Sequence, residues 1–356
     1  MSDRLKELRA QIDALDVDIL KLINQRAACA HEIGQIKQGA FYRPEREAQV
    51  LRRIKDLNAG PLTSEAAARL FREIMSACLA LEKRLSVAYL GPAGTFSEAA
   101  AVKQFGHAAQ TMACGSIDEV FRITEAGTTD YCVVPVENST EGAVNRTLDL
   151  LTQTHLRICG EVVLRIHHHL LAKTADLPFA SIKRVYSHSQ SLAQCHEWLN
   201  LQLPGVQRIP TFSNAEAARI AASEEGSVAV AGEMAAERYG LHLLAQNIED
   251  ESNNTTRFLV LGSHETGRSG KDKTSLVMSA KNVPGAVHEL LSPLARHGVS
   301  MTKFESRPSR TELWEYVFFV DIEGHIEDDV IATTITELKE KTAFLKVLGS
   351  YPVAVL

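Results

Sequence analysis

The first 85 residues carry a helical pattern of apolar positions. Apolar or small residues recur in alternating steps of three and four from Leu5 to Ile36, which places them along one face of a single helix. A helix of that length spans about 45–50 Å at 1.5 Å per residue. Because a domain of this size cannot bury so long an apolar face, we expect a second copy of the chain to cover it.

Two shorter helices are predicted in the same segment. Pro44 suits the first turn of one helix, and the run NAGP at 58–61 is a stop signal for it. Thr63 or Ser64 can cap the next helix, which continues through Leu81. Residues 3–85 are therefore predicted to be all helical.

The pattern changes at residue 87. Short apolar runs at 87–90, 131–136, 228–231 and 258–261 alternate with helical stretches, and glycines separate them. This alternation is typical of an α/β domain with largely parallel strands.

The last quarter of the chain has a third pattern. A polar stretch at 263–272 is predicted to be a linker. Beyond it we expect strand, helix, strand, strand, helix and strand at 274–280, 286–297, 299–305, 315–322, 328–341 and 344–348, a ferredoxin-like order. The chain is thus predicted to be multidomain: all-α at 1–85, α/β at 86–265 and α+β at 273–356.

Composition limits the partners and the cellular compartment that we expect for this chain. Apolar content is 45%, charged content is 23%, and no apolar run reaches the roughly 18 residues that a membrane span needs. The net charge is −6 without a basic cluster, which argues against nucleic acid as a partner. Six cysteines without a C-x-x-C pair indicate reduced thiols in a cytoplasm. Of the three histidines at 167–169, a strand would place only His167 and His169 on one face, so a structural role is favoured over a metal site.

One cation interrupts the apolar face of the first helix. Arg26 stands where a leucine would continue it, and a buried guanidinium is costly unless an anion meets it. The plainer alternative is that its stem packs while its head reaches water. Lys37 lies three turns further on nearly the same face. Arg9 is 17 residues earlier and about 100° around the axis, so it could serve the same small molecule only from a partner subunit.

These positions resemble the all-helical chorismate mutases. The resemblance rests on LR at 8–9, Arg26, IGQIK at 33–37 and YRPERE at 42–47. It implies an intertwined dimer whose catalytic residues are Arg9 from the partner chain, Arg26, Lys37, Arg46, Glu47 and Glu82. A Claisen rearrangement needs a dicarboxylate held in a folded shape and donors at the ether oxygen. Arg9 and Arg26 are expected on the carboxylates, Lys37 and Glu82 at the ether oxygen, and Glu47 on the substrate hydroxyl.

Four motifs in the α/β segment place polar groups at strand ends and helix starts. They are GPAGTFS at 91–97, PVENSTEG at 135–142, SHSQSLAQC at 187–195 and NNTTRF at 253–258. Each alone could be a turn or a helix cap, although the first could also bind an anion. Carboxyl ends of strands are where sites in α/β proteins usually lie.

Together the four motifs resemble the prephenate dehydratases. The resemblance implies a two-lobed, periplasmic-binding-protein-like fold with the site in its cleft. It implies Thr256 as the acid, with Glu137 and His188 as rival proton sources, and Arg257 as a clamp for a carboxylate. The other substrate-binding residues expected are Gly94, Thr95, Ser97, Asn138, Ser139, Gln190 and Phe258.

The C-terminal segment resembles the ACT domains appended to dehydratases. The resemblance rests on KNVPGAVH at 281–288 and ESRP at 305–308. It implies a phenylalanine site at a dimer interface, formed by Gly285, Ala286, Val287, Glu305, Ser306, Arg307 and Pro308. His288 departs from the usual GALV run. The alternative is a domain that only dimerises.

The combined prediction is a bifunctional enzyme of phenylalanine biosynthesis, both isomerase and lyase. It would convert chorismate to prephenate and prephenate to phenylpyruvate, with L-phenylalanine as a feedback inhibitor. We expect a homodimer or larger homo-oligomer with no cofactor, no metal, and no nucleic acid or membrane partner. The alternatives are an amino-acid-sensing binding protein with inert catalytic domains, and a chain that keeps only one of the two activities.

Overall fold

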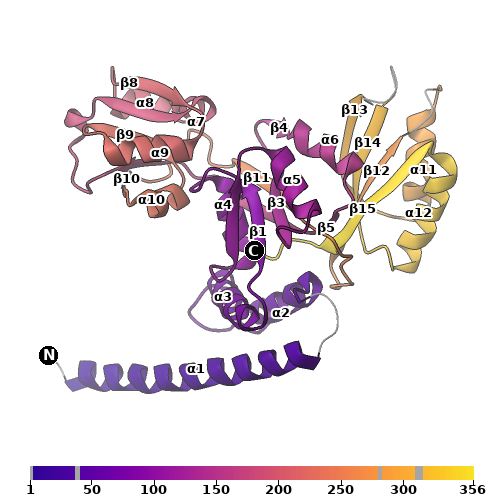
Figure 1. Cartoon of the computed structure of the whole chain (residues 1–356), viewed down its shortest axis with the longest axis horizontal. Helices are drawn as coiled ribbons and strands as arrows, with labels where there is room; N and C mark the ends of the chain where they lie inside the picture. The colour runs from indigo at the N-terminus through magenta and orange to yellow at the C-terminus, as the bar shows by residue number, and fades with distance from the viewer. Residues whose placement is uncertain (1–2, 37–40, 280–282, 309–315) are drawn as a thin grey trace.

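The computed structural model describes residues 3–36, 41–279, 283–308 and 316–356. Three helices come first: α1 (Asp3–Ile36), α2 (Pro44–Leu57) and α3 (Ser64–Glu82) (Figure 1). The hydroxyl of Thr63 accepts from the Ala66 amide at 3.2 Å and caps α3 as predicted. The three-helix prediction is confirmed.

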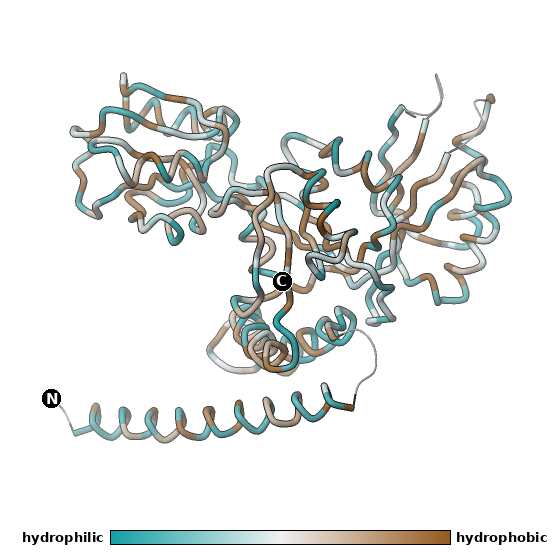
Figure 2. The backbone as a smooth tube through the Cα atoms, in the orientation of Figure 1, coloured by the Kyte–Doolittle hydropathy of each residue, from teal (hydrophilic) through white to brown (hydrophobic). Residues whose placement is uncertain are grey.

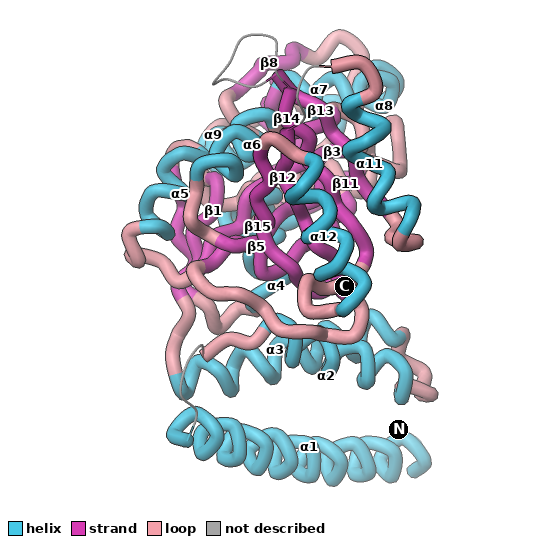
Figure 3. Tube along the Cα trace, turned by 90° about the vertical axis from the view of Figure 1, so that its right-hand side faces the viewer, coloured by secondary structure: helices cyan, strands magenta, loops and turns pink. Residues whose placement is uncertain are grey.

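Helix α1 lies outside α2 and α3 and buries none of its residues (Figures 1 and 3). Its apolar positions alternate with polar ones along the whole length (Figure 2). Ile12 is 56% exposed and Leu15 is 59% exposed, although both belong to the predicted apolar face. Within this single chain, the apolar face of α1 is therefore largely uncovered.

Two lobes follow. The first contains β1 (Ser86–Leu90), β2 (Gln110–Cys114), β3 (Tyr131–Asn138), β4 (Gly142–Ala143), β5 (Arg157–Arg165) and β11 (Thr255–Gly262). Its sheet order is β2-β1-β3-β11-β5 with β4 on β3, and its helices are α4 (Phe96–Phe105), α5 (Ile117–Glu125) and α6 (Asn145–Gln153).

The second lobe has a sheet ordered β10-β6-β9-β7-β8. Its strands are β6 (His169–Ala172), β7 (Arg184–His188), β8 (Gln207–Thr211), β9 (Ser227–Ala231) and β10 (His242–Ala245). A 3₁₀ turn (Phe179–Ser181) precedes β7, and the helices are α7 (Ser189–Gln194), α8 (His196–Gln202), α9 (Asn214–Ser223) and α10 (Glu233–Tyr239).

The chain crosses between the lobes twice, after β5 and before β11. Backbone bonds hold the crossings side by side: the Ile248 amide donates to the His168 carbonyl at 2.8 Å, and the Ile166 amide to the Asn254 carbonyl at 2.9 Å. Strand β11 is antiparallel to β3 and β5, and β6 is antiparallel to β9 and β10. The prediction of largely parallel strands is wrong here, because strands that follow a crossing return without a covering helix.

The C-terminal part is an antiparallel sheet ordered β13-β14-β12-β15 with two helices. Its elements are β12 (Asp272–Ser279), α11 (Ala286–Arg296), β13 (Met301–Pro308), β14 (Tyr316–Glu323), α12 (Asp329–Lys341) and β15 (Phe344–Pro352). The predicted ferredoxin-like order is confirmed. One apolar core joins this sheet to the first lobe, because Phe319 and Leu348 pack with Val134 and Leu259.

The segment predicted as a linker is partly exposed and partly packed against α2. Arg52 of α2 donates to the carbonyls of Ser269 at 3.0 Å and Lys271 at 2.8 Å. Lys55 of α2 reaches the carbonyl of Val355, near the chain end, at 3.2 Å. Within the described ranges, no helix has the length and apolar character needed to cross a membrane.

Candidate active sites

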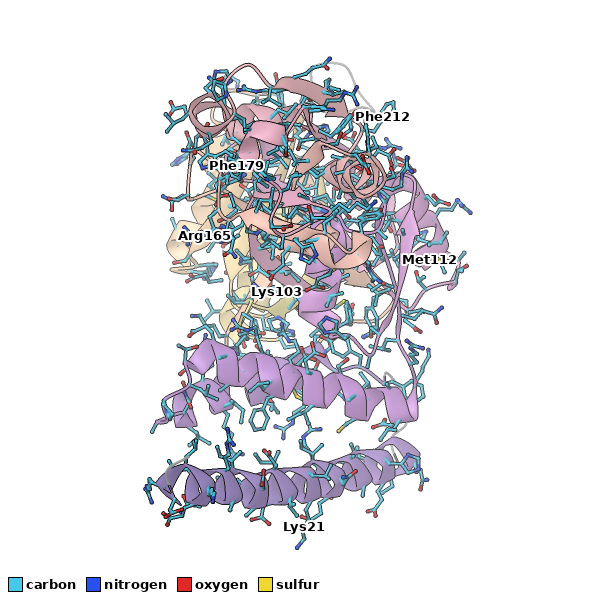
Figure 4. The ribbon with its side chains drawn as sticks, turned by 90° about the vertical axis from the view of Figure 1, so that its left-hand side faces the viewer. Lys21, Lys103, Met112, Arg165, Phe179 and Phe212 are labelled. Atoms are coloured by element: carbon cyan, nitrogen blue, oxygen red, sulfur yellow. The ribbon has the colours of Figure 1, made fainter. Side chains whose placement is uncertain are left out.

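A cleft of 720 Å³ opens between the two lobes. The first lobe contributes the loop before α4, the end of β3 and the start of β11. The second contributes the starts of α7 and α9, including Phe212, which is 99% exposed and projects from this lobe (Figure 4). Both lobes therefore face one cavity, as the two-lobed prediction requires.

Thr256 and Asn138 form the polar centre of the cleft. The Asn138 side-chain amide donates to Thr256 Oγ1 and to Asn254 Oδ1, each at 2.8 Å. The Asn138 side-chain oxygen accepts the backbone amides of Thr140 at 3.0 Å and Glu141 at 3.1 Å, which fixes the orientation of the Asn138 amide. Because Thr256 Oγ1 accepts from Asn138, its own hydrogen is left to be donated elsewhere.

Three further residues extend this network, and sequence reasoning did not assign them. Gln194 Oε1 accepts from Asn254 at 3.3 Å and lies 2.9 Å from His168 Nε2. Burial lowers the pKa of His168, which favours its neutral form. Asn254 and Gln194 stand inside quoted motifs and could have been found there. His168 comes from the crossing between the lobes, for which the sequence carries no signal.

Four predicted substrate-binding residues do not line the cleft. Arg257 is bound to Glu161 at 2.8 Å and Asp321 at 2.6 Å, and Phe258 is buried in the core. Glu137 pairs with Lys303 at 2.8 Å, and the Ser139 hydroxyl bonds to a backbone carbonyl. Successive residues of a strand point to opposite faces, so Arg257 cannot share a face with Thr256. Arg257, predicted as the carboxylate clamp, therefore does not reach the cleft in this structure.

The loop before α4 is only partly as predicted. Gly94, Thr95 and Ser97 line the cleft. The Gly94 amide, however, donates to Glu98 Oε2 at 2.6 Å, and Thr95 is the N-cap of α4. The Gly94 amide is thus occupied by a carboxylate of its own chain and is not an anion donor in this structure.

The electrostatics of the cleft are unexpected for a dicarboxylate substrate. His188 and Gln190 line it, as do two carboxylates, Glu141 and Glu216. No lysine or arginine is among the described residues that line it. Amide and hydroxyl groups and the N-termini of α4 and α9 are the donors that remain.

The predicted mutase residues are spread over the helical part. Arg9 and Arg46 are exposed, and Lys37 lies outside the described residues. Arg26 is half-buried, and its Nη1 atom has no hydrogen-bond partner among the described residues. The Glu82 side chain lies against Gly34 of α1, where an added Cβ would be 2.4 Å from Glu82 Oε2.

Glu47 sits in a buried junction between α2, α3 and α4. Arg72 Nε lies 3.1 Å from Glu47 Oε1, and Arg72 also donates to the carbonyl of Lys103 at 2.7 Å. The Tyr42 hydroxyl accepts from Gln104 of α4 at 2.9 Å. Burial raises the pKa of Glu47, and the charge of Arg72 opposes that rise. Sequence reasoning missed Arg72, because nothing local distinguishes it from a surface arginine.

Comparison with known proteins decides the family. The model of chorismate mutase type II matches residues 8–83, that of prephenate dehydratase 87–266 and that of the ACT domain 274–340. The bifunctional chorismate mutase/prephenate dehydratase of Neisseria gonorrhoeae is 59% identical over 363 residues, and the match covers 100% of both chains. The chain belongs to the bifunctional chorismate mutase/prephenate dehydratases.

Solved structures resemble the dehydratase and ACT parts of this bifunctional mutase/dehydratase. The prephenate dehydratase from Arthrobacter aurescens in complex with L-Phe has a TM-score of 0.69 at 33% identity, covering 75% of this chain and 90% of that one. A chain described as a quorum-quenching acylase, GqqA, also has a TM-score of 0.69, at 29% identity and 76% and 98% coverage. Fold alone therefore does not fix the chemistry, and the site must carry that argument.

The ACT part of this mutase/dehydratase holds the predicted effector residues in two places. Gly285 has a φ of 82° and precedes α11, which begins with Ala286 and Val287. Glu305, Ser306, Arg307 and Pro308 end strand β13. Arg307 does not project freely, because it donates to the Asn145 carbonyl at 2.6 Å and lies 3.1 Å from Asp149, both on α6.

The histidine triplet of this mutase/dehydratase lies at the first crossing between the lobes. His167 precedes β6, and its ring lies beside that of His169 with the ring centroids 6.4 Å apart. His167 Nδ1 is 2.8 Å from Glu249, on the second crossing. The described part of the chain holds no group of three or more His, Cys, Asp or Glu side chains that could hold a metal ion.

Proposed function

We propose that this bifunctional enzyme rearranges chorismate to prephenate in its helical part and converts prephenate to phenylpyruvate in the cleft between its lobes. The division at 1–85, 86–265 and 273–356 is part of this proposal. The observation that carries the dehydratase assignment is the oriented Asn138–Thr256 pair. It presents a hydroxyl donor to a cavity large enough for a small dicarboxylate.

Thr256 is the proton donor to the departing ring hydroxyl. Threonine is a weak acid, so its proton must move as the ring carboxylate leaves as CO₂ and the ring becomes aromatic. Asn138 aids this step by holding Thr256 Oγ1 as an acceptor, so that the threonine hydrogen points to the substrate. Glu137 is a weaker candidate because it pairs with Lys303 outside the cleft. His188 lines the cleft and remains the rival proton source.

The carboxylates of prephenate are bound without a cationic side chain. The N-termini of α4 and α9 border the cleft, and helix N-termini attract anions through their free amides and dipole. Gln190, His188 and Ser97 supply side-chain donors beside them. This arrangement replaces the clamp that Arg257 was expected to form.

The mutase site is completed by a second chain. The uncovered apolar face of α1 supports an intertwined homodimer. In that dimer the partner's Arg9 joins Arg26 and Lys37 around chorismate, with Arg46, Glu47 and Glu82 from α2 and α3. Nη1 of Arg26, which has no hydrogen-bond partner in the described part of the chain, is the observation that calls for an anion.

L-Phenylalanine is the effector, bound by the ACT part of the enzyme. The Arthrobacter aurescens relative was solved in complex with L-Phe. In this chain Val287, Met301 and Phe304 are exposed apolar residues on α11 and β13, the elements that carry the two motifs. A second copy covering them would enclose Gly285 and Glu305. The enzyme acts in the cytoplasm, which suits its six free cysteines.

A coupled assay tests the whole proposal. Chorismate is supplied, phenylpyruvate is followed by its absorbance, prephenate is supplied separately, and each assay is repeated with L-phenylalanine. Turnover of both substrates with inhibition by L-phenylalanine is expected. Binding of the amino acid without turnover would indicate a sensing protein, and turnover of one substrate would show that only one site is active.

A further inference from the structure

The strands that carry Thr256 and Asn138 have a second face. In the antiparallel pair of β11 and β3, Thr256 lies opposite Asn138 and Arg257 lies opposite Glu137. Because strand residues alternate between faces, Thr256 and Asn138 point into the cleft while Arg257 and Glu137 point away from it. Two adjacent residue pairs of β11 and β3 thus connect the candidate dehydratase site to the residues that contact the opposite face of these strands.

The C-terminal sheet holds Arg257 on that opposite face. Arg257 Nη1 donates to Asp321 of β14 at 2.6 Å, and Nη2 donates to the Tyr351 hydroxyl of β15 at 2.9 Å. Arg257 Nε donates to Glu161 of β5 at 2.8 Å, and Lys273 of β12 donates to the same carboxylate. The Arg257 side chain is only 14% exposed, so these bonds are shielded from water.

The C-terminal sheet also contacts β3 through Glu137, the residue that pairs with Arg257. Lys303 of β13 donates to Glu137 Oε2 at 2.8 Å, and its side chain is 11% exposed. Four residues further along β13, Arg307 bonds to α6 of the first lobe. The strand that ends in the predicted effector motif is therefore the strand that binds the back of β3.

We propose that Arg257 and Glu137 are positioning residues of the dehydratase, through which Asp321, Tyr351 and Lys303 of the C-terminal sheet set the geometry of Thr256 and Asn138. This inference rests on the proposed roles of Thr256 and L-phenylalanine. A displacement of Arg257 moves the adjacent Thr256 backbone, and the 2.8 Å bond from Asn138 to Thr256 tolerates little displacement. Misplacement by about 1 Å can cost on the order of 100-fold in rate.

The same contacts give the effector a route to the cleft. A ligand bound near β13 changes dehydratase activity only if it interacts differently with two arrangements of the sheet. Movement of β13 or β14 alters the bonds from Lys303 and Asp321, and these bonds end one residue away from Asn138 and Thr256. No bound molecule has to reach the cleft itself.

Full-length variants test the proposal. Lys303→Met and Asp321→Asn are each expected to lower the dehydratase kcat by roughly tenfold with a KM within about twofold of native, because the reacting groups are displaced while the cleft remains. Mutase activity of the same chains is expected to stay native, which excludes general unfolding. Lys303→Arg, which keeps a cation within reach of Glu137, is expected to restore most of the kcat. Glu323→Gln, an exposed acid on the same strand as Asp321, is the matched control and is expected to behave as native.

The effector response provides a second readout. Calorimetry is expected to show that Lys303→Met still binds L-phenylalanine, while the fold inhibition of its dehydratase is at least severalfold smaller than native. If Lys303→Met and Asp321→Asn both keep the kcat and the fold inhibition within about twofold of native, the proposal is overturned. If the native enzyme neither binds nor responds to L-phenylalanine, the proposed effector is wrong, and the kcat comparison alone then decides the positioning role.

Discussion

The two candidate active sites differ in how much of each one chain provides. The dehydratase cleft is assembled from both lobes of a single chain, and its central pair already has hydrogen-bonding distances. The predicted mutase residues that the structure describes lie on α1, α2 and α3, with Arg9 exposed and one nitrogen of Arg26 without a described partner. In Figure 4, Lys21 projects from α1 away from the rest of the molecule.

The difference follows from the elements that carry the residues. Strand ends and crossings bring distant motifs together inside one chain, whereas a 34-residue helix separates Arg9 from Arg26 by about 25 Å. A site on such a helix needs residues from other helices, and we propose that a helix of a second chain packs on the exposed apolar face of α1. The dehydratase should therefore respond to point changes in one chain, and the mutase to changes in either of two chains.

The largest expected effect is at Thr256. Thr256→Val keeps the shape of the side chain and removes the proton, so the dehydratase kcat should fall by about 10²–10⁴-fold. Mutase activity should not change, since the two sites share no residue. Prephenate turnover and chorismate turnover, measured on the same preparation, check both statements.

Thr255→Val is the matched control, because Thr255 precedes Thr256 on β11 and bonds only to backbone and to Ser139. It should retain the dehydratase kcat within about twofold, as expected of a substitution outside the cleft. If Thr256→Val retained turnover, the role of proton donor would be assigned to His188 instead.

The next largest effect is expected for the two arginines assigned to the mutase site. Arg9→Met and Arg26→Met should each lower mutase activity by about 10²–10³-fold, because each removes a cation from a buried dianion site. In mixed dimers of the two variants, one site regains both arginines and the other loses both. Co-expression in equal amounts should thus restore about a quarter of native activity.

Co-expression of Arg26→Met with Arg46→Met is the control, since both residues are assigned to the same chain's site. That pair should regain nothing. Equal recovery in the two mixtures would show that Arg9 does not act across the interface.

The sequence predicted the helices and strands better than it predicted the direction in which individual side chains point. The helices of the first segment and the ferredoxin-like order follow from local periodicity and capping, and both were confirmed. Arg257 was assigned to the cleft because it adjoins Thr256, yet strand alternation turns it toward Asp321. Alternation could have been applied from sequence alone, whereas the partner Asp321 could not have been predicted.

Contacts between distant segments explain the other omissions. His168 reaches Gln194 only because the first crossing lies beside α7, and Arg72 reaches Glu47 only because α2 packs against α3. The segment at 263–272 was predicted to be a linker, and its polar composition does not reveal its contact with Arg52. Periodicity describes one element at a time, and these residues act between elements.

A smaller effect concerns Glu82, which lies against α1 at Gly34. A carboxyl group donates to the ether oxygen only while protonated, whereas a glutamine amide donates at every pH. Glu82→Gln should therefore retain mutase activity, whereas Glu82→Ala, which removes the donor, should lower it by about tenfold. Native activity in Glu82→Ala would mean that Glu82 does not donate to the ether oxygen.

The smallest expected effect is a shift in the acid limb of the mutase profile. Burial raises the pKa of Glu47, and Arg72 opposes the rise by stabilising the carboxylate. Glu47 must be ionised to accept from the substrate hydroxyl, so activity is lost as pH falls through its pKa. Arg72→Met should raise that pKa further and move the acid limb of the activity profile to higher pH.

The control for Arg72→Met is Arg69→Met, an exposed arginine on the same helix, which should leave the acid limb in place.

The raised pKa of Glu47 also determines how the free energy of unfolding changes with pH. The folded chain binds this proton more tightly than the unfolded chain, so the contribution of Glu47 is complete below its unfolded pKa and is lost as pH rises through its folded pKa. Arg72→Met should widen that window, and urea unfolding across the acid range would measure it. An acid limb that stays in place in Arg72→Met would mean that Glu47 does not have to be ionised. The junction with α4 would then matter for packing alone.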